Sequence, residues 1–237
     1  MSLPVAILAG GRATRLGPIA ERLPKALVDV AGRPFAVHQL ELLRGHGLTD
    51  IVFLVGHLGE MICNTLGDGA RWGVHVRYVF DGPRLLGTGG AIRRALPALG
   101  DTFFVMYGDS YLECDFGAVQ RTFLASGKSG LMTVYRNDNQ LDVSNVQHEG
   151  SVILRYDKQH RILEMHHIDY GLGAFRASAF AGRGEEESFD LAAVFQDLLA
   201  HDDLAAFEVP DRFYEIGSPA GLEETRAYLT AKGLAAR

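Results

Sequence analysis

Cysteine and tryptophan are scarce in this chain of 237 residues, which contains two cysteines and one tryptophan. The cysteines, Cys63 and Cys114, are too few and too far apart for a disulfide framework or a zinc knuckle. We therefore expect both thiols to be reduced and packed, as in a cytoplasmic protein.

Long apolar runs and an excess of positive charge are also missing. No run reaches the ~18 residues that a membrane span requires, and the opening MSLPVAIL lacks the basic segment of a secretory leader. The formal net charge of −6 argues against a general nucleic-acid-binding surface, although a local basic pocket can still attract phosphate. We expect small-molecule partners, no nucleic acid and no membrane, with a homodimer left open.

The chain does contain a regular alternation of short apolar runs and helix-period segments, which is typical of a mostly parallel sheet covered by helices. The predicted strands of the first half are 4–8, 50–55, 74–80 and 102–107, and the helices between them 34–45, 58–66 and 89–97. Further strands are predicted at 131–136, 143–147, 151–158 and 161–175, and two last helices at 189–200 and 219–231. We predict one Rossmann-like, three-layer α/β domain over 1–237, with a mixed, mostly parallel sheet and an added small β layer over one edge.

The segment LAGGRATRLGP, residues 8–18, follows the first predicted strand. In open α/β sheets, ligands bind at the carboxyl ends of the strands. Glycines let a phosphate approach backbone N–H groups, and arginine grips phosphate oxygens in pairs. The segment therefore predicts a polyphosphate cradle, with a tight turn carrying surface arginines as the alternative. Neither the P-loop spacing nor the dinucleotide-binding spacing is present.

Lys25 follows Pro24, whose ring fixes the local backbone. A lysine held in this way can direct a point charge at a phosphate. The combination of GGRATRL (10–16) and PKALVDVAGRPF (24–35) resembles the sugar-phosphate nucleotidyltransferases, which include mannose-1-phosphate guanylyltransferases. The resemblance continues in LLGTGGAIRRAL (85–96), MYGDSYL (106–112) and RFYEIGSPAGLEET (212–225), and more loosely in LRYDKQHRIL (154–163) and HIDYGLGAF (167–175).

This resemblance implies that a sugar 1-phosphate attacks the α-phosphate of a nucleoside triphosphate, which releases pyrophosphate and forms a nucleotide sugar. It implies a nucleotide-binding half, 1–112, a sugar-phosphate-binding half, 113–237, and Mg²⁺ as the cofactor. The implied catalytic residues are Arg15 at the leaving phosphates, Lys25 at the reacting phosphates, and Asp109. The implied substrate-binding residues are Leu8, Gly10, Gly11, Gly87, Thr88, Gly89, Gly90, Asp109, Lys158, Asp169 and Gly171, and the implied metal ligands are Asp109 and Glu215.

Two of these positions depart from the family pattern. Glu215 stands where the family has aspartate, and its extra methylene shifts the carboxylate relative to a metal that demands near-ideal geometry. Either the backbone compensates, the contact runs through water, or Asp211 serves instead. Asp169 stands where asparagine is usual, and can be either a sugar-binding acceptor or an ordinary strand-edge residue.

The resemblance does not fix the base or the sugar. We favour GTP and a manno-configured sugar phosphate, either mannose or heptose 1-phosphate. Two other classes of function stay open. A nucleotide-sugar sensor would share the fold without catalysis, and a related transferase would use phosphocholine or a molybdenum cofactor as acceptor.

Three histidines near Asp169, at positions 160, 166 and 167, raise the question of a metal site. Neighbouring residues of a strand point to opposite faces, so only His167 can share a side with Asp169. Two ligands do not make a zinc site, and we predict none from these residues.

Overall fold

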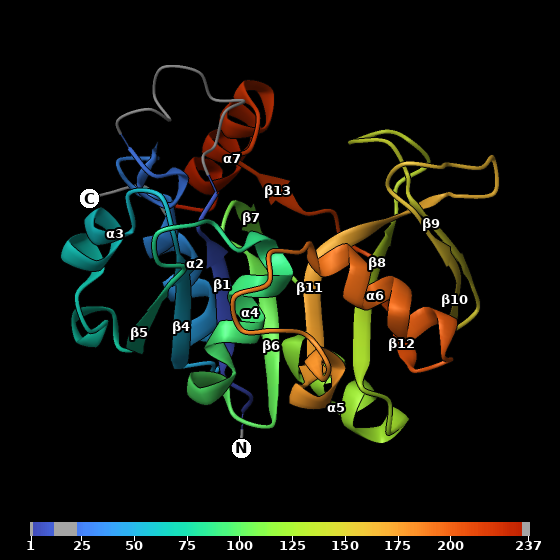
Figure 1. The fold of residues 1–237 in the computed structure, drawn as a ribbon. Helices are drawn as coiled ribbons and strands as arrows, with labels where there is room; N and C mark the ends of the chain where they lie inside the picture. Colours follow the sequence, from blue (N-terminus) through green and yellow to red (C-terminus); the bar gives the residue numbers. More distant parts are fainter. Residues whose placement is uncertain (1, 12–22, 234–237) are drawn as a thin grey trace.

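A nine-stranded sheet runs through the protein (Figure 1). The computed structural model describes residues 2–11 and 23–233. The parallel part of the sheet consists of β1 (Val5–Ala9), β4 (Asp50–Val55), β5 (His75–Phe80) and β6 (Thr102–Tyr107). These strands run in the order β6-β1-β4-β5, all parallel. They lie within one residue of their predicted positions.

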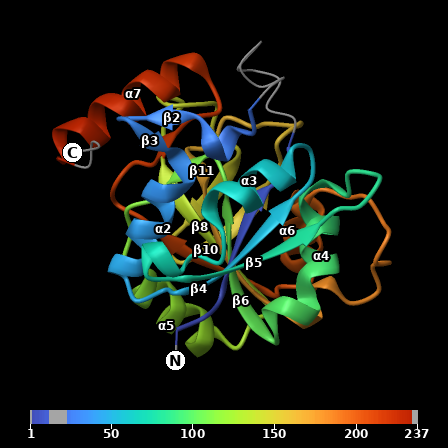
Figure 2. The same cartoon turned by 90° about the vertical axis from the view of Figure 1, so that its left-hand side faces the viewer.

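Helices cover both faces of the sheet. They are α2 (Phe35–Gly45), α3 (Gly59–Leu66), α4 (Gly87–Leu99), α5 (Phe116–Ser126), α6 (Leu191–Ala200) and α7 (Pro219–Ala231). Figure 2 shows α2 and α5 on one side and α4 and α6 on the other. The predicted three-layer α/β fold is therefore confirmed, whereas α5 was not among the predicted helices.

Strand β1 shows why both faces need a cover. Val5 and Ile7 belong to the apolar core beneath α2, α3 and α5, whereas Ala6 belongs to the core beneath α4 and α6. All three residues are fully buried. An apolar run without polar alternation is the pattern of a parallel strand covered on both sides, and it made these strands predictable.

The middle of the chain extends the same sheet. It contains β8 (Gly130–Arg136), β9 (Val146–Glu149), β10 (Val152–Tyr156), β11 (His167–Arg176) and β12 (Leu204–Glu208). Strand β11 pairs antiparallel with β6 on one side and with β8 on the other. The middle strands therefore extend the main sheet and do not form the separate layer over its edge that we expected. The small separate sheets are β2 (Asp29–Val30) with β3 (Arg33–Pro34), and β7 (Ser110–Tyr111) with β13 (Tyr214–Glu215). Three 3₁₀ turns complete the described chain: Lys25–Leu27, Ala70–Trp72 and Ala177–Phe180.

The sequence led us to expect no membrane-spanning segment and two packed, reduced cysteines. Among the described residues, no helix is both long enough and apolar enough to cross a membrane. Cys63 and Cys114 are both free and partly buried. Burial raises the pKa of the Cys114 thiol to about 12, so this thiol is protonated and unreactive at neutral pH.

The acidic segment 184–188 is an exposed loop whose backbone approaches the first turn of α4. A Cβ on Gly89 would lie 2.3 Å from the ring of Phe189, and one on Gly90 would lie 2.3 Å from the carbonyl oxygen of Glu187. Glycine at these two positions therefore has a packing reason of its own, because the first turn of α4 touches the segment that leads into α6.

Gly89→Ala is expected to lower the free energy of unfolding by about 1–3 kcal/mol, the usual cost of overpacking. Denaturant titration measures this change. The control is Gly45→Ala on α2, where an added Cβ meets nothing within 4 Å and should stabilise the protein slightly. Equal stabilities for the two variants would contradict the packing described here.

Candidate active site

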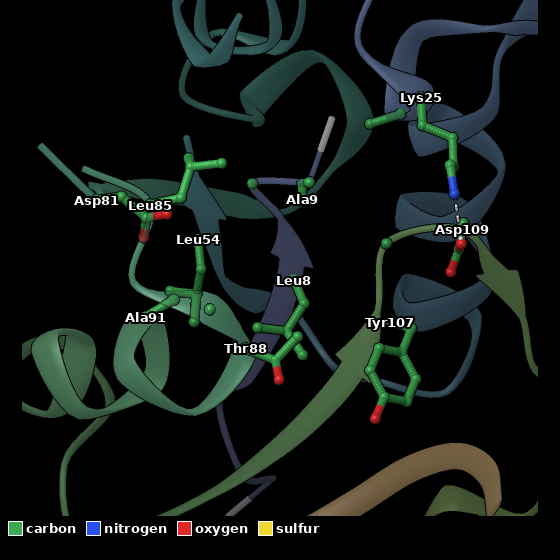
Figure 3. A pocket seen from close by; sticks show the side chains of 15 residues that line it. Leu8, Ala9, Lys25, Leu54, Asp81, Leu85, Thr88, Ala91, Tyr107 and Asp109 are labelled. Carbon is green, nitrogen blue, oxygen red and sulfur yellow. Dashed lines mark hydrogen bonds and ion pairs between the residues drawn. The ribbon is translucent and has the colours of Figure 1, made fainter. Parts of the chain in front are cut away.

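A cavity of about 250 Å³ opens at the carboxyl ends of β1 and β6 (Figure 3). It lies where strand order predicts a ligand site. Its lining includes the predicted residues Leu8, Gly10, Gly11, Lys25, Gly87, Thr88 and Asp109, together with Asp81, Leu85 and Tyr107. Figure 3 shows Asp81 at one end of this cavity and Lys25 with Asp109 at the other.

Lys25 and Asp109 form an ion pair at that second end. Lys25 Nζ lies 2.8 Å from Asp109 Oδ2, and the two side chains are 21% and 32% exposed. Pro24, in an extended conformation, leads into the 3₁₀ turn that begins at Lys25. Asp109 lies two residues after the end of β6, and Gln39 of α2 fixes that turn by donating to the carbonyl oxygens of Tyr107 and Ser110, at 3.3 and 2.8 Å. A cation and an anion are thus held at one edge of the sheet.

Glu215 reaches the same place from the far end of the chain. In the β7–β13 pair, Glu215 lies opposite Ser110, and the N–H of Ile216 donates to the carbonyl oxygen of Asp109 at 2.9 Å. A Cβ on Gly217 would lie 2.7 Å from Glu215 Oε2, 3.1 Å from Asp109 Oδ2 and 3.4 Å from Lys25 Nζ. The three charged groups therefore surround one small space, which is open because residue 217 is glycine.

Both carboxylate oxygens of Glu215 accept hydrogen bonds at the beginning of α7. Oε2 accepts from the N–H groups of Gly217 and Ser218, the latter at 3.1 Å, and Oε1 accepts from the Ser218 hydroxyl at 2.6 Å. This end of a helix favours negative charge. Asp211, our alternative to Glu215, lines neither cavity of the site and lies near Tyr170.

A second cavity, of about 810 Å³, adjoins the first and shares Tyr107 and Asp109 with it. Residues 107–224 line it, whereas residues 8–109 line the first. The predicted residues Lys158, Asp169 and Glu215 lie in its wall, together with Arg161 and Arg212. Two hollows therefore meet at Asp109, one on each half of the chain.

Asp169 is a partly buried acid in the wall of this second cavity. Its Oδ1 accepts from the N–H of Gly171 at 3.0 Å, whereas its buried Oδ2 has no hydrogen-bond partner among the described residues. Burial is the main cause that raises the pKa of Asp169, and the nearby Lys158 ammonium opposes this effect. Lys158 Nζ lies 5.8 Å from the ring centres of both Tyr107 and Tyr156. The pair presents one positive group and one acceptor to the cavity.

Several predicted residues lie elsewhere. Arg15 lies outside the described residues. Gly89 and Gly90 face Phe189 and Glu187 and do not line the first cavity. Gly171, with φ of +98°, lies behind the cavity wall, where a Cβ would come within 3.3 Å of the Tyr107 ring. Thr88 lines the cavity and also accepts from the N–H of Leu191 at 2.7 Å, which ties α4 to α6.

Comparison with known proteins gives the family. Residues 5–144 match the family model described as nucleotidyl transferase. The chain belongs to this family. The fold agrees, because it superposes on HddC from Yersinia pseudotuberculosis with a TM-score of 0.74 at 24% identity, covering 96% of this chain and 99% of that one. It also superposes on a candidate glucose-1-phosphate thymidylyltransferase from Bacillus anthracis with a TM-score of 0.84 at 20% identity, covering 96% and 95%.

Two curated relatives show how the family resemblance is distributed. An N-acetylmuramate alpha-1-phosphate uridylyltransferase from Neisseria meningitidis is 41% identical over 117 residues, 49% of this chain and 51% of that protein. A mannose-1-phosphate guanyltransferase from Candida albicans is 28% identical over 233 residues, 95% of this chain and 64% of that protein. The chain spans about half or less of the length of the first curated relatives it matches, namely 51%, 31% and 42%.

Asp81, Tyr107 and Gly217 belong to the site and were not among the residues predicted from the sequence. Asp81 directly follows the parallel strand β5, so the rule that selected Asp109 could also have found it. It is 5% exposed, its pKa is raised mainly by burial, and its Oδ2 accepts from the N–H of Leu86 at 3.3 Å. No sequence pattern marks Gly217 as a site residue, because it comes close to Asp109 and Lys25 only when β13 pairs with β7.

Asp169→Asn is expected to stabilise the protein near pH 7 and to lose that advantage in acid. The raised pKa of Asp169 in the folded state means that the wild type loses stability as the pH rises from the unfolded-state pKa of ~3.9 through the folded-state value. Asparagine has no charge to bury and still offers an acceptor to Gly171. Urea unfolding between pH 4 and pH 8 measures the difference.

The matched control is Asp202→Asn. Asp202 is exposed, and its hydrogen bond from Lys128 lowers its pKa. Its stability effect therefore changes only below the unfolded-state pKa of ~3.9, and between pH 4 and pH 8 this variant should differ from the wild type by a nearly constant free energy of unfolding. If the free energies of unfolding of the wild type and Asp169→Asn differ by the same amount at every pH, Asp169 is not buried as a charged group.

Proposed function

We propose that this chain transfers a nucleotidyl group from a nucleoside triphosphate to a sugar 1-phosphate and releases pyrophosphate. One observation carries the proposal. Two cavities, each large enough for a part of the substrates, meet at the charged cluster of Lys25, Asp109 and Glu215. The activities named for the relatives, uridylyl, thymidylyl and guanylyl transfer to sugar phosphates, support it.

In the proposed reaction, an oxygen of the sugar phosphate attacks the α-phosphorus, and the bond between that phosphorus and the bridging oxygen of pyrophosphate breaks. The attacking oxygen is already ionised near neutral pH, so no protein base has to remove a proton. Rate acceleration then depends on alignment and on neutralising the phosphates. Lys25 lies where the two cavities meet and can neutralise the reacting phosphates, and Lys158 can hold the sugar phosphate.

The charged cluster also fits a magnesium ion. Asp109 Oδ1 accepts no hydrogen bond from the described residues, and the space that a Cβ on Gly217 would fill lies between carboxylate oxygens. Hard oxygen ligands suit Mg²⁺. We propose Asp109 and Glu215 as its ligands; when bound, the ion would help to neutralise the phosphate charge. The hydrogen bonds that Glu215 accepts from Ser218 and Gly217 orient its carboxylate without using all of its lone pairs.

We propose GTP as the nucleotide and mannose or heptose 1-phosphate as the acceptor. Asp81 supports the guanine base, because an ionised carboxylate can accept from both N1–H and N2–H of guanine, whereas uracil offers one donor on that edge. Asp81 also lies at the end of the first cavity opposite Lys25 (Figure 3), as a base should relative to its phosphates. The 41% identity to a uridylyltransferase favours a second pair, UTP and N-acetylmuramate 1-phosphate. A cytoplasmic location accords with these substrates and stays a prediction.

Lys25→Ala and Asp109→Asn are each expected to lower pyrophosphate release by at least ~100-fold, the usual effect of removing a group that stabilises transition-state charge. An excess of chelator should abolish release by the wild type. The matched control is Lys128→Ala, which breaks another 2.8 Å ion pair, with Asp202, on the surface. If Asp109→Asn or chelated enzyme turns over normally, the magnesium proposal is wrong. Tight binding of a nucleotide sugar without turnover by any pair would favour a sensor.

Asp81→Asn is expected to lower kcat/KM for GTP by about 10- to 100-fold, equivalent to ~1–3 kcal/mol for a paired base contact. Asparagine places a donor where guanine also donates. The assay compares GTP, UTP, dTTP, CTP and ATP against a panel of sugar 1-phosphates and phosphocholine, with the exposed Asp101→Asn as control. Turnover of UTP with N-acetylmuramate 1-phosphate, and none of GTP, would replace our first pair with the second.

A further inference from the structure

Two buried histidines lie side by side at the end of the sheet formed by β9, β11 and β12. His148 comes from β9 and His167 from the beginning of β11, and their ring centres are 4.9 Å apart. Their side chains are only 3% and 8% exposed. This part of the sheet curls, so that β10 lies beside β12 (Figure 1). The curl is what brings Glu208, the last residue of β12, to the same two rings.

The three side chains approach one another at ligand distances. His167 Nε2 lies 3.3 Å from Glu208 Oε1, and His148 Nδ1 lies 3.9 Å from Glu208 Oε2. One potential ligand atom from each residue can be chosen so that all three lie within 4.8 Å of one another. Ligands at ~2.0–2.2 Å from a tetrahedral zinc ion are separated by roughly 3.4 Å, so small side-chain shifts would complete such a site.

The histidine pair lacks the hydrogen bonds that usually accompany buried imidazoles. His148 Nε2 and His167 Nδ1 are buried without a partner among the described residues. The pair makes one side-chain hydrogen bond in the described structure, from His167 to Glu208. The two unpartnered atoms are the ring nitrogens that do not approach Glu208, so His148 Nδ1 and His167 Nε2 are the nitrogens placed to ligate an ion together with the Glu208 carboxylate.

We propose that His148, His167 and Glu208 bind one divalent transition-metal ion such as Zn²⁺. Two imidazoles and one carboxylate are a known zinc donor set, with a fourth position for water. Glu208 is 46% exposed, which gives the ion a way in. Burial and the neighbouring His167 lower the pKa of His148, so this ring is neutral and able to ligate at neutral pH.

This site is separate from the proposed magnesium site and shares no residue with it. The bound ion would connect β9, β11 and β12. Along the chain, His148 and His167 are 19 positions apart, and His167 and Glu208 are 41 positions apart. Asn145, in the wall of the second cavity, links the two sites: its N–H donates to the carbonyl oxygen of His167 at 2.9 Å and its Oδ1 accepts from the N–H of Asp169 at 3.2 Å. The ion would therefore stabilise the strands that carry Asp169, whatever reaction the protein performs.

Calorimetric titration of the chelator-treated full chain with Zn²⁺ tests the proposal. We expect one ion per chain for the wild type and at least ten-fold weaker binding for Glu208→Gln and His148→Gln. Glu208→Gln is the decisive variant, because a half-exposed position tolerates the change without unfolding. Zn²⁺ should also raise the unfolding temperature of the wild type and not that of Glu208→Gln, whereas Mg²⁺, a poor partner for imidazole, should reproduce neither effect.

The matched control is His75→Gln, which removes an exposed histidine 3.7 Å from Asp50 and should leave Zn²⁺ binding unchanged. Absence of stoichiometric binding by the wild type would overturn the proposal. Equal affinity of Zn²⁺ for the wild type and Glu208→Gln would overturn it as well, because binding would then occur at other histidines.

Discussion

The arrangement of the candidate site depends on one ion pair, Lys25 with Asp109, held at the carboxyl edge of the sheet. Asp109 is fixed from both sides, because β6 precedes it and the β7–β13 pair begins just after it. Lys25 offsets part of the negative charge that the carboxylates of Asp109 and Glu215 bring to this point. In the proposed reaction, the Lys25 ammonium would be shared between the Asp109 carboxylate and the phosphates of the substrate.

Glycine serves two different purposes around this site. Gly217 leaves open the space between the carboxylates, whereas Gly89 and Gly90 let the segment before α6 touch α4. Both kinds belong to motifs that resemble the same family, and the resemblance implied substrate contact for Gly89 and Gly90 but gave no role to Gly217. The structure separates them by what a Cβ would meet: charged oxygen atoms in one case, and a phenyl ring and a carbonyl oxygen in the other.

The two ends of the sheet differ in the way they bring residues together. In the parallel part, helical crossovers return the chain so that the strands all end at one edge, and the residues that line the first cavity are all within the first 109 positions. In the antiparallel part, the curl of the sheet brings β12 back to β9. From the sequence we predicted no metal site among His160, His166 and His167, and His160 and His166 do lie apart from His167, beside Asp157 and Asp138 on the surface. The neighbours of His167 are residues that no local pattern connects to it.

By itself, the sequence determined the parallel strands, the helices that cover them, and the edge where a ligand would bind. These features follow from local periodicity: an apolar run predicts a buried strand, and the residue after that run lies at the edge, as Asp109 does. Tertiary structure decided which carboxylate joins Asp109, that Asp81 faces the same cavity, and that His148 meets His167 and Glu208. These contacts join residues up to about a hundred positions apart, and they depend on strand pairing and sheet curvature, which the pattern of a single segment does not encode.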